Sequence, residues 1–250
     1  MNLNAFARDM DSERCHNVSM NVPVEMTPTE LLGQLNEVEQ KYAPQMLFVV
    51  GRRDILNNRP RVSIVGSRKA SAEGIQRARK LAKLVVQQGG LVVSGLAAGI
   101  DTAAHTSAIN SNGFTAAVIG TPLSKSYPRE NTELQALIQR EHLCVSQFPE
   151  GYPTQPKNFP IRNRTMALIS DATVIIEAGE KSGAISQGWE ALRLGRGLFI
   201  SKAVVDNRSL TWPDEMLAHG AEVLSDKSLD AFFSSLPVRI LPFELNGISF

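Results

Sequence analysis

A short basic turn, Gly66-Ser67-Arg68-Lys69, follows the apolar run that ends at Val65. Residues 72–88 come next and have the pattern of an amphipathic helix. A turn between a strand and a helix presents backbone N–H groups at the positive end of the helix, a favourable place for a phosphate. Arg68 adds a planar fork of donors that suits the same anion. The turn predicts an anion site; the alternative is an ordinary connection with an exposed arginine.

A second glycine-rich turn begins at Ser94-Gly95 and precedes another predicted helix. Its glycines would let a ligand approach the backbone closely. We expect Asp101 to cap that helix through its side-chain oxygen. His105 lies one turn further on the same face, so an Asp–His acid/base relay is the alternative. Ser94 lacks the Gly-x-Ser-x-Gly spacing of an activated nucleophile, which favours binding over catalysis.

Residues 157–164 combine cations, amides and an aromatic ring, and we expect them to form a loop before a helix over 163–169. Cations with an interleaved ring suit a single nucleic-acid strand, because charges follow the phosphates and the ring stacks on a base. The residues that would do this are Lys157, Phe159, Arg162, Asn163 and Arg164. In the alternative, the arginines pair with Glu177 or Asp171 and the ring fills a core. The segment does not separate the two interpretations.

Ser182 and Gly183 repeat the combination of a small polar residue and a glycine before a helix. This third turn is suited to a phosphate or a ribose. The fingerprint Gly-x-Gly-x-x-Gly and the Walker pattern are both missing from the sequence, and its four histidines lack metal-ligand spacing. We therefore expect no cofactor and no metal.

Charge is concentrated in one part of the chain. The net charge is only +1, yet residues 52–83 hold ten Lys or Arg against Asp54 and Glu73. Such a block beside a phosphate turn favours a polyanion, although a solvated helix face explains Arg77, Lys80 and Lys83 equally well. The chain begins without a signal-like apolar run, and no stretch approaches the ~20 apolar residues of a membrane span. We expect a soluble, cytoplasmic protein.

Short apolar strands alternate with helices along most of the chain. This order predicts right-handed crossovers and an α/β fold with a doubly wound, mostly parallel sheet, covered by helices on both faces. Ligands bind such sheets at the carboxyl ends of the strands, where the three turns would converge. The expected strands are 46–50, 61–65, 91–94, 115–119, 143–147, 172–176, 197–200 and 222–224, and the further helices are 101–112, 130–141, 185–194 and 214–219.

The core is expected to cover residues 44–225. Residues 1–43 would be a flexible arm followed by one short helix, which begins at Thr27-Pro28-Thr29-Glu30 with a capping box. Residues 226–250 would form a tail that packs on the core or on a second subunit.

Several of these motifs, taken in order, resemble the DNA-processing protein A (DprA/Smf) family. They are Val65-Gly66-Ser67-Arg68, the run from Ser94-Gly95 to His105, Tyr127-Pro128-Arg129-Glu130-Asn131, Phe159-Pro160-Ile161-Arg162-Asn163-Arg164, Glu177-Ala178 with Ser182-Gly183, and Gly195-Arg196. The resemblance implies a Rossmann-like core, a homodimer, and no catalytic turnover. It further implies binding of single-stranded DNA and its delivery to the RecA recombinase, as in natural transformation and recombination.

The resemblance also implies which residues contact the DNA. They are Gly66, Ser67 and Arg68 in the first turn, Ser94 and Gly95 in the second, and Lys157, Phe159, Arg162, Asn163 and Arg164 in the cationic segment; we add Lys69. Two alternatives belong to the same fold group: a nucleotide phosphoribohydrolase and a nucleotide-sensing module. The hydrolase pattern Pro-Gly-Gly-x-Gly-Thr-x-x-Glu is not found at the third turn, and a mononucleotide needs few cations. The sequence therefore favours a sequence-independent, single-stranded DNA-binding recombination mediator.

Overall fold

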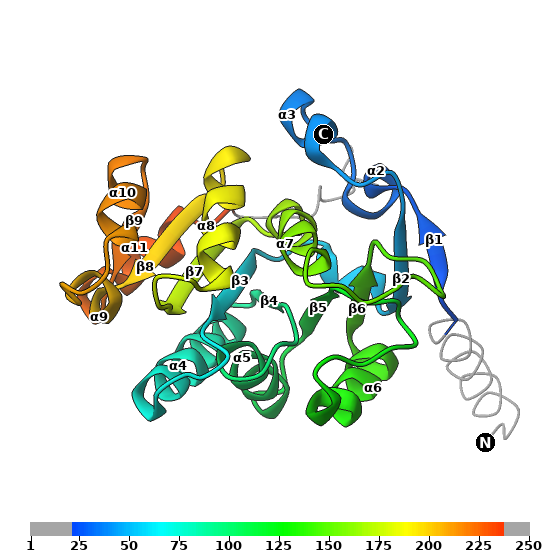
Figure 1. Cartoon of the computed structure of the whole chain (residues 1–250), viewed down its shortest axis with the longest axis horizontal. Coiled ribbons are helices and arrows are strands. Elements are labelled where there is room, and N and C mark those ends of the chain that lie inside the picture. The colour runs from blue at the N-terminus through cyan, green and yellow to red at the C-terminus, as the bar shows by residue number, and fades with distance from the viewer. Residues whose placement is uncertain (1–21, 238–250) are drawn as a thin grey trace, which may run out of the picture.

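The structure is a computed structural model that describes residues 22–237, which form a nine-stranded sheet with the strand order β1-β2-β6-β5-β4-β3-β7-β8-β9 (Figure 1). The strands are β1 (Val24–Met26), β2 (Leu47–Gly51), β3 (Arg61–Gly66), β4 (Leu91–Ser94), β5 (Thr115–Ile119), β6 (Leu143–Ser146), β7 (Ala172–Glu177), β8 (Gly197–Ser201) and β9 (Glu222–Leu224). From β6 to β9 in this order every neighbouring pair is parallel, whereas the pairs β1–β2 and β2–β6 are antiparallel. The predicted mostly parallel α/β sheet is confirmed; β1 was not predicted.

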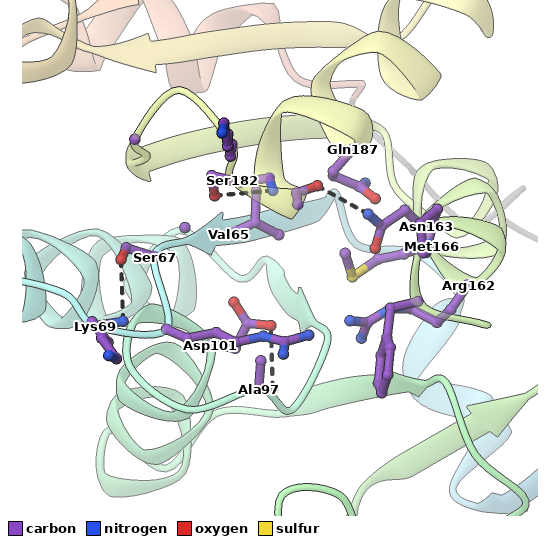
Figure 2. A pocket seen from close by; sticks show the side chains of 18 of the residues that line it. Val65, Ser67, Lys69, Ala97, Asp101, Arg162, Asn163, Met166, Ser182 and Gln187 are labelled. Atoms are coloured by element: carbon purple, nitrogen blue, oxygen red, sulfur yellow. Dashed lines mark hydrogen bonds between the residues drawn. The ribbon is translucent and has the colours of Figure 1, made fainter. Parts of the chain in front are cut away.

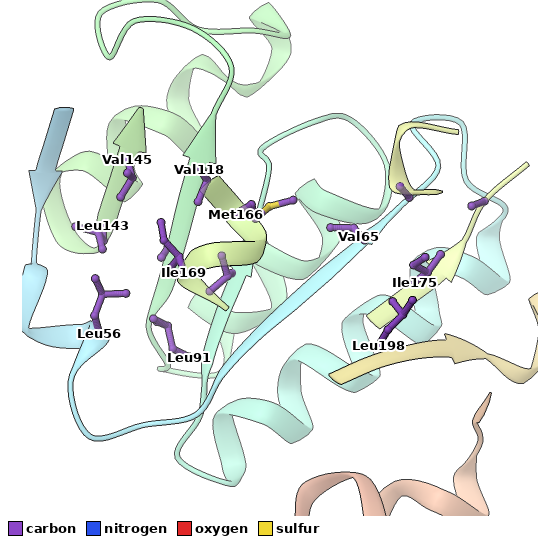
Figure 3. Packing of buried hydrophobic residues seen from close by; sticks show 14 of the residues in the cluster. Leu56, Val65, Leu91, Val118, Leu143, Val145, Met166, Ile169, Ile175 and Leu198 are labelled. Atoms are coloured by element: carbon purple, nitrogen blue, oxygen red, sulfur yellow. The ribbon is translucent and has the colours of Figure 1, made fainter. Parts of the chain in front are cut away.

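Helices cover both faces of this sheet, as predicted for a doubly wound fold. Figure 1 shows α4 (Ala72–Gln87), α5 (Ile100–Asn110) and α6 (Thr132–Glu141) on one side, and α7 (Asn158–Ile169) and α8 (Gly183–Arg193) on the other. Side chains alternate along β3: Val62 and Ile64 pack with α4 and α5. Val65 joins the cluster under α7 and α8 shown in Figure 3, with Met166 and Ile175. Burial on both faces explains why the strands are continuously apolar in sequence.

The remaining helices are shorter and lie towards the two ends of the described chain. They are α2 (Pro28–Leu32), α3 (Glu37–Tyr42), α9 (Lys202–Val205), α10 (Trp212–Ala218) and α11 (Leu229–Ser235), with single 3-10 turns η1 (Arg53–Leu56), η2 (Arg129–Asn131) and η3 (Asp226–Ser228). No helix within residues 22–237 has the length and apolar character needed to cross a membrane.

The predicted single helix before the core is wrong, because the chain forms two. The Thr27–Glu30 capping box begins α2 as expected, but Gly33 ends it at φ +85°. Asn36 then caps α3, accepting hydrogen bonds from Val38 N and Glu39 N. A left-handed glycine followed by a new cap stops and restarts a helix within a few residues. The domain boundary at residue 43 stays a prediction. Of the predicted tail, residues 226–237 form η3 and α11 and pack on the core through Phe232, and residues 238–250 lie outside the described residues.

The loop predicted over residues 157–164 is also wrong, since α7 already begins at Asn158. Pro160 lies in the first helical turn, where its missing N–H would have no partner within the helix in any case. Phe159, Arg162 and Asn163 are therefore placed by helical periodicity, and neighbouring side chains can point to different sides.

The strand order reverses at β3. From β3 the chain moves outward through β4, β5 and β6, and then returns to add β7, β8 and β9 on the other side of β3. Such a switch point leaves a crevice at the carboxyl ends of the central strands. The three polar turns leave β3, β4 and β7 at this place.

Candidate functional site

A pocket of about 750 Å³ opens at the carboxyl ends of β3 and β7, beside the first turns of α7 and α8 (Figure 2). All three predicted turns reach it. Its lining combines residues 65–69, Ala97, Asp101, Tyr127, Pro156, Phe159, Pro160, Arg162, Asn163, Met166, residues 179–184 and Gln187. Of the predicted site residues, Ser94, Gly95, Lys157 and Arg164 are not among them.

The first turn is held mainly by β7. Ser67 N donates to the Glu177 carbonyl at 2.7 Å, and Lys69 N donates to Ser67 Oγ at 3.1 Å. The Glu177 carboxylate accepts from both Ser71 N and Ser71 Oγ. Two of the amides expected to bind an anion are thus used within the protein. What the turn offers outward is the pair of exposed side chains Arg68 and Lys69.

Gly66 is required by this packing. A Cβ at this position would lie 2.6 Å from Ile100 Cγ1 and 2.7 Å from the Glu177 carbonyl oxygen. Both distances are too short for carbon, so any larger residue would push the turn away from α5 and β7. We therefore assign Gly66 to positioning the cations that follow it.

The second turn is covered by protein. Ser94 is fully buried, and its Oγ donates to the Ile64 carbonyl at 2.7 Å. The Arg162 guanidinium lies against Gly95, where a Cβ would come within 2.0 Å of Nη1. A residue in this position cannot reach a strand of DNA while the fold is intact. The direct contacts expected of Ser94 and Gly95 are therefore replaced by a structural role.

Arg162 and Asp101 form a buried charged group beneath the pocket. Arg162 Nη1 donates to the Gly95 carbonyl at 2.5 Å and to the Val118 carbonyl at 2.6 Å, which ties α7 to β4 and β5. Asp101 Oδ2 accepts from Gly95 N at 3.2 Å and Ala97 N at 3.3 Å. The carboxylate thus supports the turn, and the predicted helix-cap role is wrong because Gly99 occupies the N-cap of α5.

Burial sets the protonation of this group. It raises the pKa of Asp101, against the opposing attraction of Arg162. It also lowers the pKa of Arg162 to about 10, with Asp101 acting in the opposite direction. Arg162 is thus a cation with two carbonyl partners, and we replace its predicted phosphate contact with a positioning role.

The alternative of an Asp101–His105 relay does not fit the structure. His105 is fully buried, and its Nδ1 lies 2.7 Å from Thr115 Oγ1, which itself donates to the Val92 carbonyl. His105 Nδ1 must therefore donate, and its partner is on β5. Burial lowers the pKa of His105 to about 3, so the ring stays neutral at physiological pH.

This lowered pKa predicts acid sensitivity. An unfolded histidine binds a proton below about pH 6.5. The folded one does not until about pH 3. The unfolding free energy should therefore fall as pH drops through this window, by up to about 1.4 kcal/mol per pH unit from this one group. Urea unfolding between pH 7 and pH 4 should give a shallower pH dependence for His105→Gln than for the parent. An unchanged dependence would assign the effect to other groups.

Phe159 and Tyr127 form a pair of contacting aromatic rings at the pocket rim. The half-buried Phe159 ring lies 5.1 Å from the Tyr127 ring, and the Arg68 guanidinium carbon lies 5.1 Å from the Phe159 ring centre. Gly120 leaves room beneath the ring, since a Cβ there would be 2.8 Å from Phe159 Cδ1. Tyr127 remains 45% exposed. A ring and a guanidinium in contact offer one surface for a base and one charge for a phosphate.

The rest of α7 divides between the pocket and the opposite side. Asn163 Nδ2 donates to the Gly183 carbonyl at 3.1 Å and so links α7 to the third turn (Figure 2). Ser182 caps α8 by accepting from Ala184 N at 3.3 Å. Arg164 instead pairs with Glu190 at 3.1 Å, a partner that the sequence did not indicate. Lys157 is exposed just before α7.

The lining also includes a cation and a buried amide that the sequence had not singled out. Lys181 is an exposed cation in the third turn, next to Ser182. Its position after a buried strand was the available signal. Gln187 is fully buried on α8 and lines the pocket, but nothing in its local sequence marks it. Within residues 22–237, no group of His, Cys, Asp and Glu side chains could hold a metal ion.

Residues 28–236 match the sequence profile of the family described as DNA recombination-mediator protein A. The chain is 37% identical over 199 residues to Protein Smf of Synechocystis sp., covering 78% of this chain and 50% of that protein. It therefore spans about half the length of curated relatives such as this one.

Solved structures agree with this match. DNA processing protein A from Streptococcus pneumoniae has a TM-score of 0.70 at 29% identity, covering 88% of this chain and 77% of that chain. DNA processing protein A from Helicobacter pylori has a TM-score of 0.69 at 25% identity, covering 84% of this chain and 94% of that chain, and is described for its single-stranded DNA binding mode.

Proposed function

The chain belongs to the DNA recombination-mediator protein A family, and we propose that it binds single-stranded DNA independently of sequence. The observation that carries this proposal is the group of exposed cations around two contacting aromatic rings at the pocket. Arg68, Lys69 and Lys181 line the pocket together with Phe159 and Tyr127. Bases of any sequence have a face that stacks on a ring, and cations follow the phosphates.

The carboxylates at the pocket support binding without turnover. Glu177 is engaged by Ser71, as described above, and Glu180 accepts from Thr211 N and Thr211 Oγ1. Asp101 is buried and bonded to backbone amides. A hydrolase of nucleotides needs a carboxylate that is free to act on its substrate. We therefore favour a binding protein over a phosphoribohydrolase or a nucleotide sensor.

We extend the proposal to the protein's partners. A bound strand would be passed to the RecA recombinase, with a role in DNA uptake or recombination in the cytoplasm, and two copies of the chain would act as a homodimer. Light scattering tests the dimer, and assembly of RecA filaments on strand already coated by a single-strand-binding protein tests the delivery. A monomer, or an assembly rate that this protein leaves unchanged, would contradict these extensions.

Titration with labelled oligo-dT at several salt concentrations, with AMP as competitor, tests the binding proposal. Affinity should fall steeply with salt because bound cations release counterions from the DNA. AMP should compete weakly. Tight AMP binding with release of the free base would instead identify a phosphoribohydrolase, and tight binding without cleavage would identify a nucleotide sensor.

Arg68→Ala should weaken oligo-dT binding and reduce the slope of log affinity against log salt by roughly 0.7 to 1, since one phosphate contact is lost. The matched control is Lys80→Ala. Lys80 is an exposed cation on α4 that is paired with Asp226. If both variants keep the parent's slope, the DNA does not pass along the first turn.

A further inference from the structure

A second cationic cluster lies at the opposite ends of the parallel strands from the pocket. It consists of Arg52 and Arg59, which lie over the Phe114 ring, and of the exposed Arg53, which follows Arg52 in the chain, and we call it the amino-edge cluster. Arg52 follows the end of β2 at Gly51, which pairs with Leu143 at the start of β6. Phe114 directly precedes β5. The cluster is therefore at the amino ends of the parallel strands, displaced from the pocket by about 20 Å along the strand direction, the length of a strand such as β3.

Two guanidinium groups share one ring in this cluster. The Arg52 guanidinium carbon lies 4.6 Å, and that of Arg59 4.8 Å, from the Phe114 ring centre. Stacking on a ring leaves the edges of a guanidinium, with its N–H donors, open to a further partner. Like charges gathered in this way repel one another, and an anion between them would relieve the repulsion.

The charges around the cluster do not cancel. Arg52 pairs with Asp54 at 2.7 Å. Within residues 22–237, neither Arg53 nor Arg59 has a carboxylate within ion-pair distance, although Arg59 helps Arg52 to lower the pKa of Asp54; Arg53 Nη1 contacts Met26 Sδ at 3.6 Å. His142 lies edge-on to Phe114, but burial lowers its pKa, so it adds little positive charge. Glu141 nearby is engaged by Arg140.

The backbone fixes where the arginines sit. Gly51 has φ +98°, and a Cβ there would lie 2.1 Å from the His142 carbonyl oxygen. Arg52 N donates to that same carbonyl at 2.6 Å. Ile55 and Leu56 are fully buried and anchor η1 between Arg53 and Arg59. The cluster is thus held by the core, unlike cations on a free loop.

We propose that the amino-edge cluster is a second contact for the phosphate backbone of the same DNA strand. The inference rests on the proposed function, and it deepens it: a strand held at the pocket would continue across the molecule to the opposite edge. Guanidinium groups with open edges suit phosphates, and the nearby carboxylates of Asp54 and Glu141 are already paired with Arg52 and Arg140. Short strands would use only the pocket, and long strands both places.

The test compares oligo-dT of about 6 nucleotides, near the lower end of the footprint of about 4–16 nucleotides of compact single-strand-binding folds, with oligo-dT of about 30 nucleotides, well beyond it. Arg53→Gln/Arg59→Gln should reduce the salt slope for the long oligonucleotide by roughly 1.4, at about 0.7 per phosphate contact, and lower its affinity about tenfold. Binding of the short oligonucleotide should not change. Lys80→Gln/Lys202→Gln is the matched control, because it removes two exposed lysines that are paired with Asp226 and Asp206. It should leave both slopes unchanged.

Further variants and outcomes distinguish the two proposals. Phe114→Leu keeps an apolar side chain but removes the ring, and should weaken long-strand binding alone. If the parent binds both oligonucleotides and the arginine variant behaves like it, this inference is wrong and the proposed function stands. If the parent binds neither, both fall. If polyglutamate binds more tightly than oligo-dT and depends on these arginines, the cluster serves an acidic protein and not DNA.

Discussion

Replacing Arg162 by methionine is expected to lower the free energy of unfolding by about 3–5 kcal/mol, the effect of breaking a buried charged pair on one side. The substitution removes the two hydrogen bonds from Nη1 to the Gly95 and Val118 carbonyls. It also leaves the Asp101 carboxylate buried without its nearby cation. Urea denaturation followed by circular dichroism measures the loss. Typical domains have only about 5–15 kcal/mol in total, so much of the stability margin would be lost.

Arg164→Gln is the matched control for this prediction, because it lies on the same helix. Its side chain is 49% exposed, and its buried partner Glu190 also pairs with Arg193, which would remain. An ion pair with a half-exposed cation is screened by solvent, so its loss should cost about 1 kcal/mol or less. The two arginines stand two positions apart in one motif, yet only one should matter for stability. If the Arg162→Met protein has the parent's stability but binds DNA more weakly, the positioning role is wrong, and Arg162 contacts a phosphate directly as the sequence suggested.

Phe159→Ala is expected to weaken binding of single-stranded DNA by about 1–3 kcal/mol, or about 5- to 150-fold, if one base stacks on this ring. The ring is half-buried at the pocket rim and already contacts Tyr127 and the Arg68 guanidinium. Removing it takes away the stacking surface and leaves Arg68 without the ring that orients it. Fluorescence anisotropy with oligo-dT measures the effect.

Two further variants separate stacking from packing. Phe159→Leu keeps apolar volume against Gly120 without an aromatic face, so it should preserve folding but not binding. Phe233→Ala removes a partly buried ring on α11 and should leave DNA affinity unchanged. Should Phe159→Leu bind DNA as the parent does, the ring fills space and stacks on nothing.

The alternation of apolar strands and helices was sufficient to predict the fold. Val62, Ile64 and Val65 form an apolar run with only the small Ser63 among them, and their side chains are buried on both faces of β3, as in a strand covered on both sides. Because the strands were predicted to be parallel, the turns after β3 and β7 were predicted to lie together at the carboxyl ends of the strands. The edge strand β1 was missed because a segment of three residues is too short to show the alternation of a strand.

Only the tertiary structure decided which polar residues of these motifs are exposed at the pocket. Arg68 and Arg162 both belong to motifs with the same expected role, yet Arg68 is exposed and Arg162 is 5% exposed. The difference depends on α7 lying across the ends of β4 and β5, a contact between segments more than forty residues apart. Local sequence contains the charge of a side chain but not its distance from water.

The tertiary structure also changed which groups of the first turn are available to DNA. The sequence alone determined that Gly66-Ser67-Arg68-Lys69 joins a strand to a helix at a ligand-binding edge. The tertiary structure placed Glu177 against this turn, where its carbonyl accepts from Ser67 N and its carboxylate accepts from Ser71. Because a backbone donor can serve only one strong acceptor at a time, that amide is no longer available to a phosphate. In the proposed function, the side chains of Arg68 and Lys69 therefore bind the DNA in place of the backbone amides.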